Sequence, residues 1–338
     1  MSKRKTPFFN KLLYFLNSIF AMVLLLSYLL PYVSPNTIPF FAVLSLLVPV
    51  LIIINILFVV YWLIKLKKKY FLSAFVLLIG WCFSSPFYKI TEKNSSLNDD
   101  VKVMSYNVRM FNYYKWSEDT TLEKQIVDFI AEKNPDILAI QEFYDSDSIN
   151  FTYPYKFIKT KSKTDKFGLA IYSKYKIIHS GSLDLKNSAN NIIFADVIKQ
   201  KDTIRVYNLH LESLKINPHK ESFGQEDSEK LLKRLEDSFK KQANQTEKFI
   251  VHEQEWKGKK IVCGDFNNTS YSWIYNQIAK NKKDAFIEAG KGFGKTFNYW
   301  FPMRIDFIFT DETLTINQFK TFSVKYSDHF PIQARINW

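Results

Sequence analysis

Apolar residues are distributed very differently in the first and the last parts of this chain. No charged side chain lies between Lys11 and Lys65, and a further uncharged run follows Lys69. Because about 20 apolar residues are needed to cross a bilayer, these runs predict three transmembrane helices, at about residues 12–32, 38–64 and 70–88. A membrane domain is therefore expected over residues 1–90.

Basic residues cluster beside the predicted spans in two places, whereas Lys89 and Lys93 after the third span are balanced by Glu92, Asp99 and Asp100. Four precede the first span and four lie between the second and the third, whereas the loop between the first two spans has none. Short loops rich in Lys and Arg stay in the cytoplasm. We therefore expect a multi-pass protein of the cell (inner) membrane, with a cytoplasmic amino terminus and an extracytoplasmic carboxyl-terminal part. The basic residues are Lys3, Arg4, Lys5, Lys11, Lys65, Lys67, Lys68 and Lys69.

The first apolar run has a second interpretation, as a cleaved signal peptide with a basic start and an apolar core. Its core is longer than the roughly 7–15 residues typical of such peptides. No small-residue cleavage site follows it, and two more apolar runs come after it. These features favour a membrane anchor over a signal peptide.

The rest of the chain has the pattern of a globular domain. Residues 91–100 are polar and rich in Ser and Asn, as in a linker. Strand-like alternation over Val101–Val108 and helical spacing over Leu122–Glu132 begin a long series of such elements, and a charged amphipathic helix is expected at about 226–254. Many strands with few helices predict an α/β fold for residues 101–338, a layered sandwich of two sheets.

Net charge and cysteine content narrow the function classes. Of the net charge of +13, only +4 falls outside residues 1–97, so the charge does not argue for a nucleic-acid-binding face. Cys82 and Cys263 lie in separate apolar runs without neighbouring Cys or His residues. A disulfide framework is therefore not implied, and a zinc site is disfavoured.

Polar side chains able to bind metal or move protons recur where predicted strands meet loops. Catalytic groups are usually presented at such positions on a rigid sheet. Hydrolysis of a phosphate ester needs oxygen ligands for a hard cation, an oriented water and donors for the phosphoryl oxygens, and this set provides all three. Its members are Asn107, Glu142, His210, Asp265, Asn267, Asp306, Asp328 and His329.

Each of these residues, taken alone, also has a structural explanation. Asp265 and Asn267 could form an Asx-turn after a strand. Asp306 could be a buried structural carboxylate with a partner, and His210 could be an ordinary sheet residue. What favours a catalytic interpretation is the occurrence of all eight together.

The motifs that contain these residues resemble those of the endonuclease/exonuclease/phosphatase (DNase I-like) superfamily, here as a membrane-anchored bacterial-type member. The resemblance covers roughly residues 101–338 and follows the family's order. It implies a four-layer α/β/β/α sandwich and dependence on Mg²⁺ or Mn²⁺. The motifs are Ser-Tyr-Asn-Val (105–108), Gln-Glu (141–142), Gly-Leu-Ala-Ile-Tyr-Ser-Lys (168–174), Asn-Leu-His-Leu-Glu-Ser (208–213), Gly-Asp-Phe-Asn (264–267), Arg-Ile-Asp-Phe-Ile-Phe (304–309) and Ser-Asp-His-Phe-Pro (327–331).

The resemblance also implies a metal site. Glu142 would be the principal metal ligand, and Asn107 and Asp328 would complete its surroundings. The remaining five residues would act on the water and the phosphate.

In the role that the resemblance implies, Asp265 would orient or deprotonate the attacking water. Asn267 and His210 would donate hydrogen bonds to the phosphoryl oxygens. Asp306 would pair with His329 and favour its charged form. Whether Asp265 or a histidine is the working base stays open.

The sequence thus predicts a phosphoric ester hydrolase, a nuclease or a phosphatase, held at the lipid bilayer. Its substrate would be nucleic acid or a phospholipid or inositol phosphate headgroup. Aromatic clusters at Phe111–Trp116 and Phe297–Phe301 could stack on bases, enter the lipid headgroup region or serve packing. The alternative is an inactive membrane scaffold that uses the same fold to bind a partner.

Overall fold

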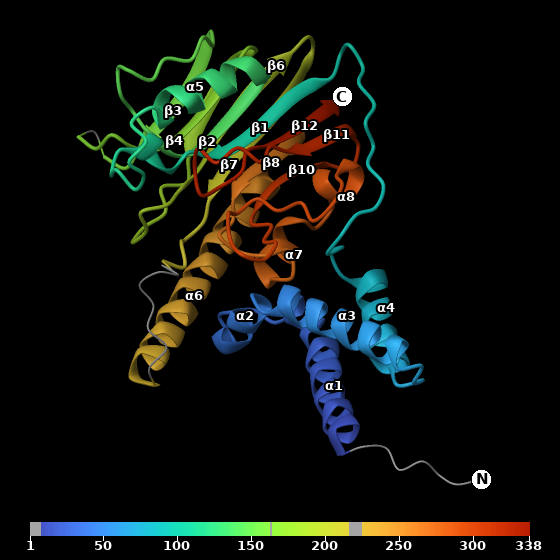
Figure 1. The fold of residues 1–338 in the computed structure, drawn as a ribbon. Coiled ribbons are helices and arrows are strands. Elements are labelled where there is room, and N and C mark those ends of the chain that lie inside the picture. Colours follow the sequence, from blue (N-terminus) through green and yellow to red (C-terminus); the bar gives the residue numbers. More distant parts are fainter. Residues whose placement is uncertain (1–7, 163, 216–224) are drawn as a thin grey trace.

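The structure, a computed structural model, describes residues 8–162, 164–215 and 225–338. Lys3, Arg4 and Lys5 lie outside the described residues. Two six-stranded sheets form the centre of the molecule (Figure 1). The first sheet has the strand order β11 (Thr315–Thr321), β12 (Ile332–Asn337), β1 (Val101–Asn107), β2 (Ile137–Tyr144), β4 (Phe167–Ser173) and β3 (Tyr155–Thr160). The second has the order β5 (Lys176–Ser182), β6 (Ile192–Lys199), β7 (Asp202–His210), β8 (Lys259–Asp265), β10 (Asp306–Asp311) and β9 (Lys282–Asp284).

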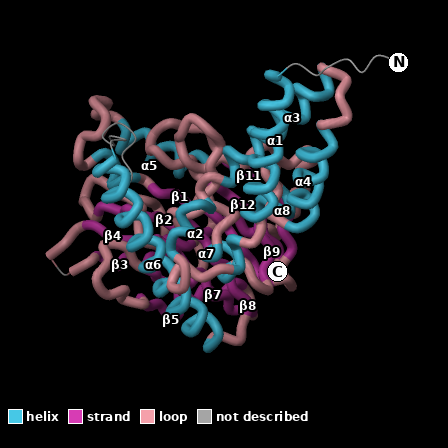
Figure 2. The backbone as a smooth tube through the Cα atoms, turned by 90° about the horizontal axis from the view of Figure 1, so that it is seen from below, coloured by secondary structure: helices cyan, strands magenta, loops and turns pink. Residues whose placement is uncertain are grey.

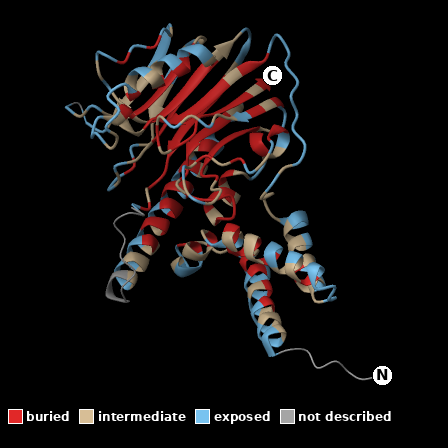
Figure 3. Ribbon diagram, viewed as in Figure 1, coloured by how far each residue is buried: buried red, intermediate tan, exposed pale blue. Residues whose placement is uncertain are grey.

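The two sheets pack face to face, and helices cover their outer faces. Aliphatic side chains such as Val103, Ile137 and Ile261 fill the space between the sheets. Helix α5 (Leu122–Lys133) packs on the first sheet, and α6 (Gln225–Glu255) with α7 (Trp273–Ile278) packs on the second. Figure 3 shows the central strands buried along most of their length, whereas β3 and β5 at the sheet edges are partly exposed. The predicted four-layer α/β/β/α sandwich is confirmed.

Element boundaries largely follow the apolar pattern. The long amphipathic helix expected at 226–254 is α6, and the strand expected before Gly-Asp-Phe-Asn is β8. The pattern gave no indication of β3 or β9 or of the short helix α8 (Ala285–Ala289), because each is short or only partly buried.

The amino-terminal helices differ from the prediction of three transmembrane spans. They are α1 (Phe8–Ser27), the 3₁₀ turn η1 (Leu30–Tyr32), α2 (Pro39–Ser45), α3 (Val48–Ile64) and α4 (Tyr70–Phe83). In the described part of the chain, only the segment Phe8–Tyr32 is one helix long and apolar enough to cross a membrane, and a bent pair of α2 and α3 could make a second. The expectation of three spans is therefore wrong.

Proline explains the broken second span, and length explains the third. The axes of α2 and α3 differ by 51°. The break at 46–47 lies within one turn before Pro49, which has no N–H to donate to Ser45 O and whose ring would clash with that carbonyl in a continuous helix. Helix α4 has 14 residues, about 21 Å at 1.5 Å per residue, and Ser84-Ser85-Pro86 follows its end. Helices α1, α3 and α4 lie side by side in Figure 2 and contact one another.

The expected linker lies against the sandwich. Lys89 and Gly292 exchange two backbone hydrogen bonds of 2.8 Å, and the backbone N–H of Ser95 donates to Asn317 O at 3.1 Å. The helices are thus joined to the sandwich by more than a free tether.

Candidate active site

Strand register brings the predicted site residues to one edge of the sandwich. Strands β7 and β8 are parallel and pair His210 with Asp265. Antiparallel β10 pairs Asp306 with the same Asp265. In the other sheet, β1 and β2 are parallel and end with Asn107 beside Gln141. All eight predicted residues therefore gather at this edge, which we call the catalytic edge.

Glycine is required just before Asp265. Gly264 has φ of +139°, and a Cβ at this position would lie 1.9 Å from Leu209 O of the neighbouring strand. Only glycine allows this close approach, so Gly264 keeps β7 and β8 close enough for His210 and Asp265 to meet.

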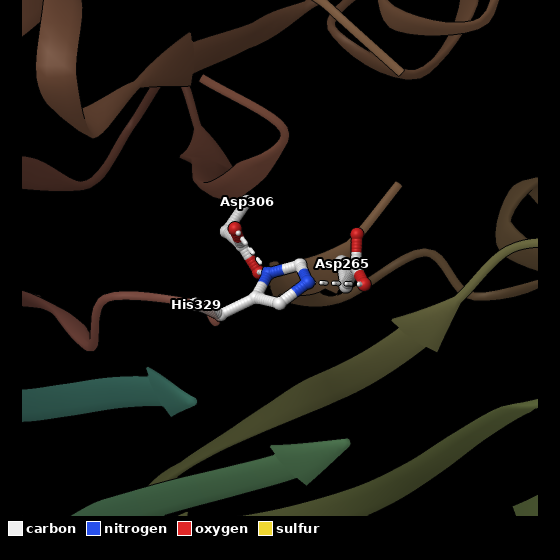
Figure 4. A group of neighbouring side chains, drawn as sticks. All are labelled: Asp265, Asp306 and His329. Carbon is white, nitrogen blue, oxygen red and sulfur yellow. Dashed lines mark hydrogen bonds and ion pairs between the residues drawn. The ribbon is translucent and has the colours of Figure 1, made fainter. Parts of the chain in front are cut away.

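A buried line of three side chains crosses the edge (Figure 4). His329 Nδ1 lies 3.0 and 3.2 Å from the two carboxylate oxygens of Asp306. Its Nε2 lies 3.6 Å from Asp265 Oδ2. Burial alone would lower the pKa of His329, but the Asp306 and Asp265 carboxylates raise it well above its usual value. The two carboxylates therefore favour the charged imidazolium form of His329.

Asp265 is the most heavily buried of the acids. Burial raises its pKa to about 6, and the Asp306 carboxylate adds to the increase while His329 and His210 oppose it. Its other oxygen accepts the backbone N–H of Asn267 at 2.7 Å. Asp265 is thus ionised at neutral pH and yet markedly more basic than an exposed carboxylate.

His210 provides a buried polar atom that has no hydrogen-bond partner among the described residues. This atom, Nε2, lies 3.6 Å from Asp265 Oδ2 and 3.8 Å from Glu142 Oε1. Burial lowers its pKa, and the Asp265 carboxylate only partly offsets this. A neutral imidazole with a free nitrogen can donate to a bound oxyanion.

Glu142 and Asp328 suit a hard divalent cation. Their side chains are 26% and 30% exposed, so both are accessible. Burial raises the pKa of Glu142, and repulsion by Asp328 raises it further. Mutually repelling carboxylates that remain accessible are oxygen ligands of the kind that Mg²⁺ and Mn²⁺ take in proteins.

A second group of possible metal ligands consists of Asp265, Asp306 and His329. In that group His329 Nδ1 is bonded to Asp306, and the charged ring that Asp306 and Asp265 favour has no lone pair on either nitrogen for an ion. The Glu142–Asp328 side of the edge fits a metal better.

Asn107 and Asn267 are held by hydrogen bonds. Asn107 Nδ2 donates to Asp265 Oδ2 at 3.0 Å and to Glu142 Oε1 at 3.3 Å, and its Oδ1 accepts the backbone N–H of Arg109. It therefore ties the two acids together here, and coordination of an ion through Oδ1 requires rotation of its amide. Asn267 Nδ2 donates to Leu211 O at 3.0 Å, which leaves its second N–H for a substrate.

Arg109 is a site residue that the sequence analysis missed. Its guanidinium lies 3.3 Å from Asp328 Oδ2 and 4.6 Å from the centre of the Trp116 ring. Residues 109–112 all have positive φ, between 46° and 65°. Such strained backbone persists where the surroundings impose it, often at functional sites. The position of Arg109 two residues after a strand-ending Asn was the one available signal.

Gln242 of α6 is a second missed residue. It is fully buried, and its Nε2 donates to Glu212 O at 2.7 Å and to Asn267 O at 3.3 Å. Its Oε1 accepts Asn268 Nδ2 at 2.8 Å. One side chain thus holds the loops that follow both His210 and Asp265.

A cleft of 760 Å³ opens beside Glu142 and His210. Its walls include an aromatic pair, Tyr114 stacked on Phe167 with ring centres 5.6 Å apart, and polar groups from Lys159 and Asn190. This space is much larger than a phosphate ion needs, so it suits the rest of a phosphate ester.

Two family models match the chain. Residues 104–329 match the endonuclease/exonuclease/phosphatase family, and residues 10–87 match a family described as a domain of unknown function. A search of curated proteins gave no match.

Several solved structures share the fold. The endonuclease/exonuclease/phosphatase from Bacteroides vulgatus is 19% identical, with a TM-score of 0.51 over 70% of this chain and 98% of that one. The catalytic domain of human Nocturnin, with bound sulfate, is 16% identical, with a TM-score of 0.52 over 72% and 96%. A humanized D. rerio TDP2 is 17% identical, with a TM-score of 0.50 over 71% and 100%.

Proposed function

This chain belongs to the endonuclease/exonuclease/phosphatase family, and we propose that it is a divalent-metal-dependent phosphoesterase that hydrolyses phosphodiester or phosphomonoester bonds. The observation that carries the proposal is the buried line of Asp306, His329 and Asp265 beside an accessible pair of carboxylates. A charged donor, a basic carboxylate and a cation site converge within one edge, as in-line attack of water on phosphorus requires.

Each side chain has a role that its surroundings support. Asp265, with a pKa of about 6, is basic enough to orient and deprotonate a water at neutral pH. His329, charged and fixed by Asp306, donates to the phosphoryl oxygens as negative charge builds on them. His210 and Asn267 donate as neutral groups. His329 is a poor base, because it is already protonated.

Glu142 and Asp328 would hold Mg²⁺ or Mn²⁺, with Asn107 and Arg109 around them. When bound, such an ion supplies positive charge that polarises a phosphoryl oxygen. Arg109, already beside Asp328, keeps part of the local negative charge balanced.

The proposal is tested with the full chain in detergent micelles and bis-p-nitrophenyl phosphate. Hydrolysis should depend on added Mg²⁺ or Mn²⁺ and stop with EDTA. It should fall steeply in the variants Asp265→Asn and His329→Gln, each shown by thermal unfolding to be folded at the assay temperature. An inactive scaffold would show no metal-dependent hydrolysis of this ester or of p-nitrophenyl phosphate. That result would end the enzymatic interpretation.

The proposal includes attachment to the lipid bilayer through α1. Many large apolar side chains of α1 are exposed, Phe8, Phe15 and Met22 among them. Lys69 Nζ donates to Asn10 O at 3.3 Å, which joins the basic turn at 65–69 to the amino-terminal end of α1. The sandwich adjoins the other end of these helices. Basic residues at the end far from the sandwich favour a cytoplasmic amino terminus and an extracytoplasmic site.

This orientation has a direct test. Alkaline phosphatase fused after Lys93 should be active, and a fluorescent protein fused there should be dark. The reverse pattern would refute the orientation without affecting the proposed chemistry.

A further inference from the structure

The amino-terminal helices contact the loops that carry the active site. Thr269, two residues after Asn267, donates to Ser45 O at 3.4 Å. Arg304, two residues before Asp306, donates to Ser85 Oγ at 2.9 Å. Figure 1 shows α7 and the neighbouring loops between the sheets and helices α2 and α3. The catalytic edge therefore lies on the side of the sandwich that meets the helices.

Apolar contacts also hold the amino-terminal helices against the sandwich. Tyr271 is buried in the same cluster as Ala21 and Leu24 of α1. On the other side of the junction, Ala42 of α2 is buried with Leu235 and Phe239 of α6. The junction thus fixes the direction of the catalytic edge relative to α1.

At the same junction, the segment 29–47 exposes large apolar side chains to its surroundings. Tyr32 is 70% exposed and Phe40 44%, although both lie in or beside the short elements η1 and α2 that adjoin the sandwich. Exposed apolar groups that continue from an apolar helix mark contact with lipid or protein. The remaining exposed residues are Leu29, Ile38, Phe41 and Leu47.

We infer that segment 29–47 lies in the bilayer surface and holds the catalytic edge against it, so that the phosphate ester hydrolysed here is the headgroup of a lipid. The inference rests on the proposed phosphoesterase function and names its substrate class. We favour lipid as the occupant of this junction, because its exposed apolar residues continue the exposed apolar residues of α1, which run from Leu12 to Leu26.

The cleft and the loops around it fit this substrate. The 760 Å³ cleft beside Glu142 and His210 has room for a polar headgroup. Phe297 contacts the His329 ring, with ring centres 5.1 Å apart. The same loop continues through Trp300, which is 76% exposed, to Pro302, which lines one small cavity with Pro49 of α3. In hydrolysis the water oxygen bonds to phosphorus, the ester P–O bond breaks, and the proton leaves with the released alcohol.

The test compares lipid and soluble substrates for the full chain. Vesicles of phosphatidylglycerol, phosphatidylethanolamine, phosphatidylinositol or phosphatidic acid in phosphatidylcholine are incubated with protein and Mg²⁺, and products are measured by mass spectrometry. The same headgroups without acyl chains, single-stranded DNA and plasmid DNA are the soluble arms. We expect at least one lipid to be hydrolysed about tenfold or more faster than its deacylated form, since the bilayer concentrates the substrate at the site.

A paired substitution tests the surface itself. Phe40→Ser with Phe41→Ser should lower the rate on vesicles about tenfold, because binding at a lipid surface scales with the apolar area inserted, and should leave bis-p-nitrophenyl phosphate hydrolysis unchanged. The control is Val251→Ser, which removes an apolar side chain that is 62% exposed on α6, away from the junction. It should change neither rate.

The outcomes separate the two proposals. If wild-type protein hydrolyses bis-p-nitrophenyl phosphate but no lipid, or prefers DNA to every lipid, the lipid inference is wrong and the phosphoesterase stands. If the Phe40 and Phe41 variant keeps its full rate on vesicles, segment 29–47 does not bring the lipid to the site. If no substrate is hydrolysed at all, the proposed function fails first.

Discussion

The pairing of Asp306 with His329 can be tested by a substitution that removes charge and little else. Asp306→Asn keeps the size of the side chain, and the backbone N–H of residue 306 keeps its 3.0 Å bond to Thr296 Oγ1. The variant loses the negative charge that lies 3.0 Å from His329 Nδ1. We therefore expect an intact fold with an altered His329.

The size of the effect follows from the geometry. Two unit charges 3.0 Å apart attract by roughly 5 kcal/mol at an effective dielectric constant of about 20. Asp265 still supports the charged ring in the variant, so only part of this will be seen. We expect the pKa of His329 to fall and kcat to fall by ~10²–10³-fold, as for loss of an acid–base group.

Stability should change with pH in a direction that can be worked out. The folded protein binds a proton on His329 more tightly than the unfolded chain does, because its pKa is raised. The stability that this provides is complete below about pH 6.5, the usual pKa of histidine, and is lost as pH rises through the folded pKa. Asp306→Asn should therefore destabilise the protein most at acidic to neutral pH, and the difference should shrink at alkaline pH.

The assay is a pH profile of kcat with bis-p-nitrophenyl phosphate, together with thermal unfolding across the same pH range. The alkaline limb should move to lower pH in the variant. His179→Gln is the matched control, since His179 also lies beside an aspartate, 3.1 Å from Asp196, but at the protein surface. An unchanged alkaline limb, or effects of Asp306→Asn and His329→Gln that simply add, would refute the pairing, because coupled residues do not add.

Three further substitutions test the remaining parts of the site. Glu142→Gln should raise the Mg²⁺ concentration for half-maximal activity about tenfold or more, since an amide is a poorer ligand for a hard cation; an unchanged metal titration would remove Glu142 from the metal site. Asp265→Asn should abolish turnover and yet stabilise the metal-free protein at pH 7 by on the order of 1–3 kcal/mol. The reason is that a carboxylate whose pKa rises to about 6 on folding destabilises the folded state at higher pH. Equal unfolding temperatures of variant and wild type at pH 7 in EDTA would contradict this. Gln242→Leu should lower kcat about tenfold or more while KM changes little, because small displacements of reacting groups are costly. The control is Thr246→Val, at an equally buried position of the same helix. If Gln242→Leu and the control have the same kcat, the hydrogen bonds of Gln242 do not position the site.

The sequence was informative wherever a polar residue closes a buried strand. Asp265 closes the apolar run of β8, and His210 closes the apolar run of β7. Such short apolar runs are typical of strands buried between two layers. Because parallel strands end at the same edge, their side chains had to meet once the two runs paired. The placement of these residues at strand ends could therefore be predicted from local patterns, whereas the pairing of the two distant strands could not.

Residues that reach the site from elsewhere left no such pattern. Gln242 lies in the middle of an amphipathic helix, and nothing in its neighbourhood marks it as a partner of Asn267 and Glu212. Arg109 is aimed by four consecutive left-handed residues, a conformation that ordinary side chains rarely adopt. The break in the predicted span 38–64 was missed for a similar reason. An uncharged run shows that a segment is apolar, but it does not show that the segment forms one continuous helix.

The interior of the helical bundle bears on whether α1 is an anchor or a cleaved signal peptide. Asn17 of α1 accepts the indole N–H of Trp62 at 2.9 Å and donates to Ser73, which in turn donates to Asn55 at 2.7 Å. All four residues are fully buried. Without α1, the Trp62 N–H and one side of Ser73 would remain unpaired, at a cost of roughly 1–3 kcal/mol for each buried group. Tyr271, from the loop that follows Asp265, would lose its packing against α1 as well. Removal of α1 after export would leave these groups of α3, α4 and the loop after Asp265 without their partners. These contacts therefore favour α1 as a permanent helix of the protein.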